Sequence, residues 1–163
     1  MTASKTSKPK RDQPTIENRK ARHAYHIHET LECGMKLTGS EVKSLRAGQA
    51  SLGEGYVRAE ENPPRLTLHG VHIAEYPPAG AARQHDPIRT RVLLASKREI
   101  RKLCHLTVPK GTTLIPLKLY FVRGVAKLLI GVATGKRRAD KRHDLAEREA
   151  RRDIDRAMTR ARR

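Results

Sequence analysis

The apolar pattern of this chain stops at Gly135, and that boundary limits what the chain can fold into. Upstream of it, the runs 113–121 and 125–133 alternate apolar and polar side chains, which is typical of strands with one buried face. Downstream, residues 136–163 contain twelve Lys or Arg, six Asp or Glu and few apolar side chains. The chain can therefore build one modest core, and that core must lie before Gly135.

The charge balance indicates the class of partner. The chain has 35 Lys and Arg against 17 Asp and Glu, so its formal net charge is +18 over 163 residues. Such a surplus predicts an anionic partner. With one Phe, four Tyr and no Trp, the chain lacks the stacking platform of a single-strand binder. This favours a folded RNA that is recognised by shape and backbone.

The compartment is predicted from the cysteines and the N-terminus. Two cysteines, Cys33 and Cys104, are too few for a disulfide framework and fit a reducing cytoplasm. The segment 1–20 is basic without an apolar stretch, and no later run approaches the roughly 18 apolar residues of a membrane helix. We therefore expect a cytoplasmic protein with no membrane partner. Residues 1–14 have the polar, basic composition of a disordered arm.

Hydrophobic periodicity predicts mainly strands before Gly135. Within the run 65–73 the apolar parity changes at Gly70, where we expect a β-bulge that bends the strand. A loop rich in Pro, Gly and Ala follows at 77–87. Strands are predicted at 25–31, 55–60, 65–73, 113–121 and 125–133, the last two as a hairpin around Arg123 and Gly124.

Two short helices complete the predicted domain. The first should begin at Ser40 as N-cap, bury Val42 and Leu45, and end at Gly48. The second should begin with a capping box of Ser96 and Glu99. Short strands with two helices indicate an α+β fold, mainly β, in which helices close a small barrel.

The charged tail has the pattern of a weak helix. Opposite charges lie at helical offsets, and Asp144 with Glu147 could form a capping box. Its apolar stripe is narrow, so the helix should need a partner to fold on, and the positive charge predicts that this partner is an RNA surface. A solvated tail that raises solubility is the alternative. The stripe consists of Ala146, Ala150, Ile154, Ala157 and Met158.

Six motifs in a fixed order point to a family. They are NRKARHAY (18–25), LTGSEVKSLRAG (37–48), HDPIRTRVLL (85–94), KREI (97–100), PLKLYF (116–121) and GKRRADKR (135–142). As an ordered set they closely resemble the SsrA-binding protein family, also called small protein B, of bacterial trans-translation. The resemblance covers roughly residues 14–160.

The resemblance implies a non-enzymatic RNA-binding protein without a cofactor. Its OB-type β-barrel, expected at 15–135, would bind the tRNA-like domain of transfer-messenger RNA by tRNA mimicry. Its tail, expected at 136–163, would be disordered when free and helical in the decoding centre and empty messenger channel of a stalled ribosome. The resemblance further implies elongation factor Tu as a partner in the delivery complex.

The resemblance also implies contact residues. It assigns contacts with the tRNA-like domain to Asn18, Glu32, Leu94 and Lys127. For Glu32, an ion pair with a nearby Arg is an alternative, since a carboxylate facing RNA must accept hydrogen bonds from a base edge or 2′-hydroxyl. Charge and motif membership add phosphate contacts at Arg19, Lys20, Arg22, Lys43, Arg46, Arg89, Arg91, Lys97 and Arg98.

In the tail, the resemblance assigns ribosome contacts at both ends. Ala157 and Met158 would lie in the messenger channel. Two positions depart from the family pattern: Ala139, where His or Tyr is frequent, and Val92, where Lys is usual. Asp140, Lys141 and Arg142, which match the DKR signature, would engage the decoding centre. The further ribosome-binding residues predicted in the tail are Gly135, Lys136 and Arg137.

Two other classes of protein remain as alternatives. A zinc enzyme could use His26, His28, His69 and His72 with a cysteine, but the sequence has no established zinc spacing and no HExxH motif. A generic ribosomal, structured-RNA-binding or DNA-binding protein would explain the charge and the barrel equally well.

Overall fold

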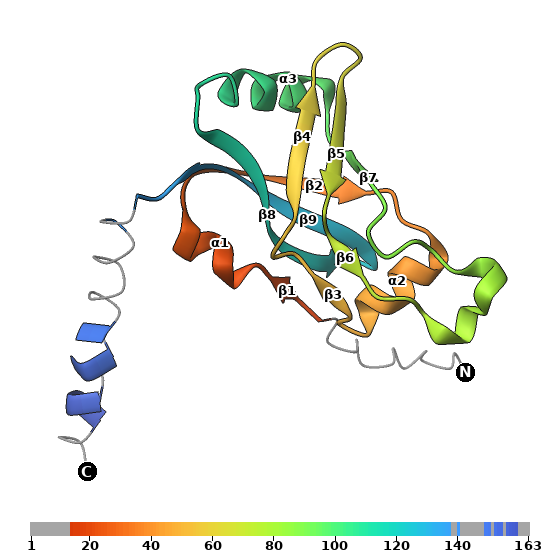
Figure 1. Cartoon of the computed structure of the whole chain (residues 1–163), viewed down its shortest axis with the longest axis horizontal. Coiled ribbons are helices and arrows are strands. Elements are labelled where there is room, and N and C mark those ends of the chain that lie inside the picture. The colour runs from red at the N-terminus through yellow and green to blue at the C-terminus, as the bar shows by residue number, and fades with distance from the viewer. Residues whose placement is uncertain (1–13, 138–139, 141–148, 151, 155, 160–163) are drawn as a thin grey trace, which may run out of the picture.

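The main sheet closes on itself as a barrel. The computed structural model describes residues 14–137, 140, 149–150, 152–154 and 156–159. Seven strands are ordered β1-β8-β4-β5-β7-β2-β9, and β8 also pairs with β9, which closes the barrel (Figure 1). The strands are β1 (Ile16–Glu17), β2 (Tyr25–Met35), β4 (Tyr56–Glu60), β5 (Arg65–His69), β7 (Arg91–Leu94), β8 (Thr112–Val122) and β9 (Val125–Gly135).

Short elements flank the barrel and complete an α+β, mainly β fold, as predicted. A separate two-stranded sheet pairs β3 (Ala50–Ser51) with β6 (His72–Ile73). Figure 1 shows α3 beside the hairpin of β4 and β5, with α1 and α2 at other sides of the barrel. The helices are α1 (Arg19–Ala24), α2 (Gly39–Arg46) and α3 (Lys97–Leu106), and the 3₁₀ turns η1 (Pro77–Ala79) and η2 (Ala81–Arg83) lie in the predicted loop.

Strand alternation fills the barrel as predicted. In β9, Leu128, Ile130 and Val132 face the main core. The hairpin between β8 and β9 turns at Arg123 and Gly124, which both have positive φ. This conformation suits a two-residue turn that follows the twist of its strands.

The predicted alternation in β8 is wrong at Ile115 and Leu117. The register with β9 shifts between Pro116 and Lys118, so Leu117 and Ile115 turn away from the main core. They form a second cluster with Ala21 of α1 and Ala133. The shift therefore builds an apolar seat for α1 on the outside of the barrel.

The expected β-bulge at Gly70 is instead a strand break. Gly70 has φ +65°, and a Cβ there would lie 2.6 Å from the Glu54 carbonyl oxygen. The chain turns at this close approach, so β5 ends in the barrel while β6 pairs with β3. Val71 and Ile73 on the far side are still fully buried.

The capping boxes define where α2 and α3 begin. The predicted box of α3 is confirmed: the Ser96 amide donates to Glu99 Oε2 (2.8 Å) and the Glu99 amide to Ser96 Oγ (3.3 Å). The predicted N-cap Ser40 is wrong, because α2 begins after Thr38, whose amide donates to Glu41 Oε2 at 2.7 Å. Glu41 thereby becomes part of the buried face of α2.

The described residues of the tail from Glu149 onward are helical, whereas Lys136 and Arg137 at its root are not. The helical residues from Glu149 onward lie apart from the barrel in Figure 1, and Ile154 and Met158 of the predicted stripe are 58% and 57% exposed. Asp153 and Arg156 form an ion pair at 3.6 Å. The predicted capping box at Asp144 and Glu147 lies outside the described residues. Among the described helices, none combines the length and apolar character needed to cross a membrane.

Candidate RNA interface

The barrel brings three of the four predicted tRNA-like-domain contacts onto one outer face. Gly34 of β2 pairs with Leu94 on one side and with Lys127 on the other. Glu32 is exposed on the same strand, and its carboxylate lies 3.3 Å from Lys127 Nζ. We call the surface made by Glu32, Leu94, Tyr120 and Lys127 the Glu32 face.

Tyr120, which is not among the predicted contact residues, also belongs to the Glu32 face. It pairs with Lys127 across the hairpin, and its hydroxyl donates a hydrogen bond to Glu32 Oε2. The sequence does contain a signal for this position, because Tyr120 is two residues from the outward-facing Lys118 in β8 and so lies on the same face. Glu32 is therefore held from two sides, by a neutral donor and by a cation.

The pKa values follow from these contacts. The hydrogen bond from Tyr120 is the largest cause that lowers the pKa of Glu32, and desolvation opposes it. A hydrogen bond from Lys127 and the positive charge of Lys127 lower the pKa further. The same bond is the main reason that the pKa of Tyr120 rises to about 12. The face thus presents an ionised carboxylate as a fixed acceptor. The ion-pair alternative for Glu32 is present, with Lys127 in place of an Arg.

We expect Tyr120→Phe to raise the pKa of Glu32 toward its ordinary value. The substitution removes the hydroxyl whose hydrogen bond is the largest cause of the lowered pKa, and it leaves the ring. NMR titration of the Glu32 side chain measures the change. An unchanged Glu32 pKa would contradict the arrangement, and Tyr25→Phe is a control at a distant phenol.

The structure places Asn18 inside the fold. Its amide nitrogen donates to the carbonyls of Leu52 (3.1 Å) and Pro116 (3.0 Å), while its Oδ1 accepts from the Ala21 amide (3.1 Å) as the N-cap of α1. The predicted RNA contact does not fit this placement, because these bonds use both amide hydrogens and the residue is buried. Asn18 instead positions α1.

Arg91 is also buried, which corrects its prediction as a phosphate contact. Its side chain is fully inaccessible, and it donates to Glu41 Oε1 (2.8 Å), the Val71 carbonyl (2.6 Å) and the Pro87 carbonyl (2.9 Å). Arg89, which keeps 31% of its side chain exposed, binds the same carboxylate at 2.5 Å. This cluster joins α2 to β7 rather than to a ligand.

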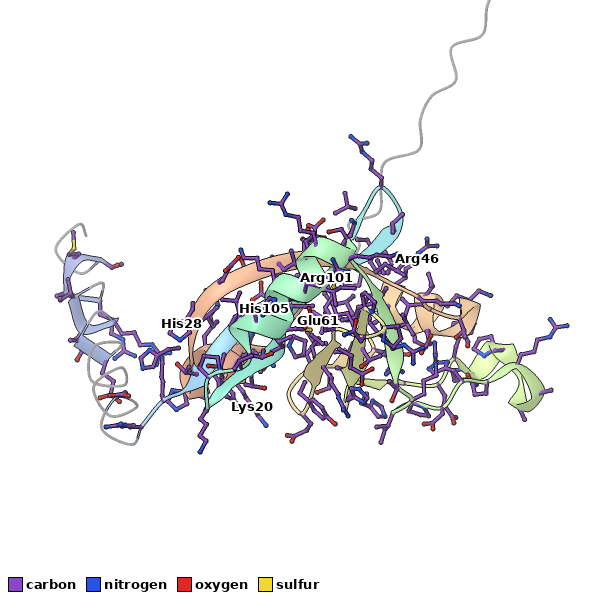
Figure 2. All side chains as sticks on the ribbon, turned by 90° about the horizontal axis from the view of Figure 1, so that it is seen from above. Lys20, His28, Arg46, Glu61, Arg101 and His105 are labelled. Carbon is purple, nitrogen blue, oxygen red and sulfur yellow. The ribbon has the colours of Figure 1, made fainter. Side chains whose placement is uncertain are left out.

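The other predicted cations lie at the surface over several elements. Lys43 Nζ is 5.1 Å from the centre of the Tyr76 ring, and the Arg46 guanidinium is 5.8 Å from that of Phe121. Figure 2 shows that the labelled Lys20 and Arg46 lie over different parts of the barrel. The exposed members of the predicted set are Arg19, Lys20, Arg22, Lys43, Arg46, Lys97 and Arg98.

The root of the tail is tied to the junction of α1 and β2. The Lys136 amide donates to the Ala24 carbonyl (2.9 Å) and its Nζ to the Arg22 carbonyl (2.9 Å). Asp140 Oδ2 accepts from the Arg137 amide at 3.0 Å, which is the main reason that the Asp140 pKa is lowered. The predicted Lys141, Arg142 and the departure at Ala139 lie outside the described residues.

Cys33 is buried and Cys104 is partly buried. Burial raises the pKa of the Cys33 thiol to about 12, and its Sγ donates to the Leu128 carbonyl at 3.4 Å. Cys104 packs against the main core. Within the described part of the chain, no group of three or more His, Cys, Asp and Glu side chains is placed to hold a metal ion.

Comparison with known proteins identifies relatives over nearly the whole chain. The family model described as SmpB protein matches residues 15–160. An SsrA-binding protein of Thermobifida fusca is 52% identical over 146 residues, which cover 90% of this chain and 89% of that relative. One from Chloroflexus aurantiacus is 49% identical over 162 residues, covering 99% and 98% of the two chains.

A solved structure agrees with these relatives. A chain from the study "tmRNA-SmpB: a journey to the center of the bacterial ribosome" matches with a TM-score of 0.64 and 46% identity, covering 81% of this chain and 94% of that chain. The matched region includes both the barrel and, in the family model, most of the tail. This chain therefore belongs to the SmpB protein family, whose relatives in these comparisons are SsrA-binding proteins.

Proposed function

We propose that the protein binds the tRNA-like domain of transfer-messenger RNA and delivers it to stalled ribosomes for trans-translation. The family match over residues 15–160 carries this proposal. The protein acts by binding rather than by catalysis, and it works in the cytoplasm with the ribosome and, during delivery, with elongation factor Tu.

The Glu32 face supports RNA recognition by the barrel. The Lys127 side chain is 31% exposed beside the fixed carboxylate of Glu32, so the cation can approach a phosphate. The carboxylate can accept a hydrogen bond from a 2′-hydroxyl or a base edge. Leu94, 56% exposed, adds an apolar contact. The exposed Arg19 and Lys20 of α1 extend the basic surface.

The division of labour follows the boundary at Gly135. The proposed units are an N-terminal arm at 1–14, the RNA-binding barrel at 15–135 and the ribosome-binding tail at 136–163. The tail helix orders on ribosomal RNA, with the segment at Asp140 in the decoding centre and Ala157 and Met158 in the messenger channel. The exposure of Met158 and Ile154 leaves the apolar stripe accessible to such a surface.

Salt-dependent binding tests the role of Lys127. We expect Lys127→Met to weaken binding of the tRNA-like domain and to reduce the slope of log affinity against log salt by about 0.7–0.9, the effect of one phosphate contact. The measurement is filter binding at several salt concentrations. Lys110→Met, at an exposed turn, is the matched control. A wild-type slope in Lys127→Met would exclude the phosphate contact.

Sequencing of the RNA that copurifies with the protein tests the alternative. A single dominant RNA with a tRNA-like end and an internal reading frame is the expected result. A mixture that reflects cellular abundance would instead identify a generic structured-RNA-binding protein. The charge of +18 alone would produce such a mixture, so the wash must contain enough salt to remove non-specific RNA.

A further inference from the structure

We propose that the outer face of β4, β5 and β7 binds an unpaired RNA base, which stacks on the Tyr56 ring. We call this surface, made by Tyr56, Arg58, Thr67, His69 and Val92, the stacking face. It rests on the proposed RNA binding, and it adds a contact of a different chemical kind from the polar Glu32 face.

An aromatic pair forms the centre of the stacking face. Tyr56 and His69 are directly opposite each other on β4 and β5, and their rings are stacked with centroids 5.1 Å apart and an interplanar angle of 11°. Tyr56 is nevertheless 50% exposed, so a further flat ring can extend the stack.

Hydrogen bonds hold the His69 ring in this orientation. Its Nε2 lies 2.9 Å from Thr67 Oγ1, and its Nδ1 lies 3.2 Å from Thr90 Oγ1. With both ring nitrogens engaged, the imidazole plane is fixed before any ligand arrives. A preorganised platform loses less conformational freedom on binding than a free side chain would.

The surroundings of the pair are apolar and cationic. Val92, which pairs with Thr67 on β7, is 40% exposed, and it stands where the family resemblance leads us to expect Lys. Arg58 lies opposite Thr67 on β4. It contacts Glu60 at 3.2 Å, yet its side chain is 68% exposed. An apolar rim with a cation at its edge suits a base with its attached phosphate.

Charge favours RNA over a protein as the partner of this face. The chain carries a net +18, and Arg65 adds a second exposed cation on the outward side of β5. Any of the RNA bases can stack on the Tyr56 ring, because every base has a π-face. The low content of Phe, Tyr and Trp in the sequence does not reveal this stacking surface, because one of its two rings is the His69 imidazole.

Fluorescence of a short oligoadenylate with one 2-aminopurine tests the proposal. The full chain, which has no Trp, should quench the probe on binding because the base stacks. Tyr56→Leu should weaken binding by roughly tenfold, within the range of about 5- to 150-fold for one stacked base, and should abolish quenching. Tyr56→Phe should retain both. Arg58→Gln should reduce the salt slope by about 0.7, whereas Tyr56→Leu should not.

The controls separate this inference from the proposed function. Val108→Ala truncates an apolar side chain that is even more exposed, at 78%, in the turn after α3, and should bind as wild type. Wild-type affinity and quenching in Tyr56→Leu would overturn the proposal. A wild-type chain that quenches the oligonucleotide but fails to bind the tRNA-like domain would contradict the proposed function alone.

Crosslinking distinguishes RNA from protein as the partner. Val92→p-benzoylphenylalanine places a photoreactive ring at the rim of the stacking face in the full chain. On ribosomes loaded with transfer-messenger RNA, we expect adducts to RNA. Adducts to ribosomal protein alone would overturn the proposal.

Discussion

Arg91→Met should lower the free energy of unfolding by about 3 kcal/mol. Breaking a buried ion pair typically costs about 3–5 kcal/mol, because one charge is left without its partner. Glu41 is fully buried, and only Arg89 would remain to neutralise it. The lower end of the range applies because Arg89 Nη2 stays 2.5 Å from Glu41 Oε2. Urea unfolding followed by circular dichroism measures the change.

Two variants serve as controls for this prediction. Arg89→Met should cost less, because the Arg89 side chain is 31% exposed and Arg91 still pairs with the carboxylate. The double variant Glu41→Leu with Arg91→Met should recover part of the loss, since neither charge is then buried. It should not recover all of it, because the carbonyls of Val71 and Pro87 lose their donor. A loss below about 1 kcal/mol in Arg91→Met would contradict the argument.

The cluster also predicts how stability changes with pH. Burial of Glu41 opposes ionisation, but hydrogen bonds from Arg89, the Thr38 amide and Arg91 outweigh it and lower its pKa to about 2. A lowered pKa stabilises the fold fully above the ordinary value of 4.5, and this contribution is lost as the pH falls toward 2. The stability difference between wild type and Arg91→Met should therefore narrow in that window. If the difference in the free energy of unfolding does not change with pH, Arg91 stabilises the fold through its hydrogen bonds to the Val71 and Pro87 carbonyls rather than through Glu41.

The alternation of side chains explains which parts of the barrel were predictable. The outward parity of Lys127 and the inward parity of Leu128 and Ile130 follow directly from a period of two residues. The same rule places Arg91 inward, because it shares its parity with the buried Leu93. Motif membership suggested a phosphate contact, and the parity was the better guide. Thr38 and Glu41 likewise have the spacing of a capping box, and this spacing is a better guide to the N-cap of α2 than the hydroxyl of Ser40.

Other features depend on contacts between distant segments. The sequence of β8 gives one local sign of the register shift, because Pro116 inside a strand is typical of a bulge, but it does not show which side chains turn outward. The signal lies in β9, where a Cβ on Gly131 would be 2.9 Å from Leu117 Cδ1 and 3.2 Å from Ile27 Cγ2. The stacking of Tyr56 on His69 also requires the pairing of β4 with β5. A single sequence does not give such pairings before the strand order is known.

Removal of the tail after Gly135 should abolish tagging of stalled peptides while most affinity for the tRNA-like domain remains. The truncated chain retains all of β9, the Glu32 face and α1, so the barrel and its proposed RNA contacts persist. It loses a tail with a surplus of six positive charges, and its salt slope should fall accordingly. Filter binding and an in vitro tagging reaction on stalled ribosomes measure the two effects, and the melting temperature confirms that the barrel is folded.

A tail of the same composition in a shuffled order is the matched control, because it preserves charge and solubility but destroys the helical spacing of Ile154, Ala157 and Met158. If the tail only raised solubility, the shuffled chain would tag as well as wild type, which is the outcome that would contradict a specific ribosomal role. If the order of side chains is what the ribosome recognises, both the shuffled and the truncated chains bind RNA and fail to tag. Tagging would then require the apolar stripe, which is too narrow to pack on a protein core but suited to a helix that folds on RNA.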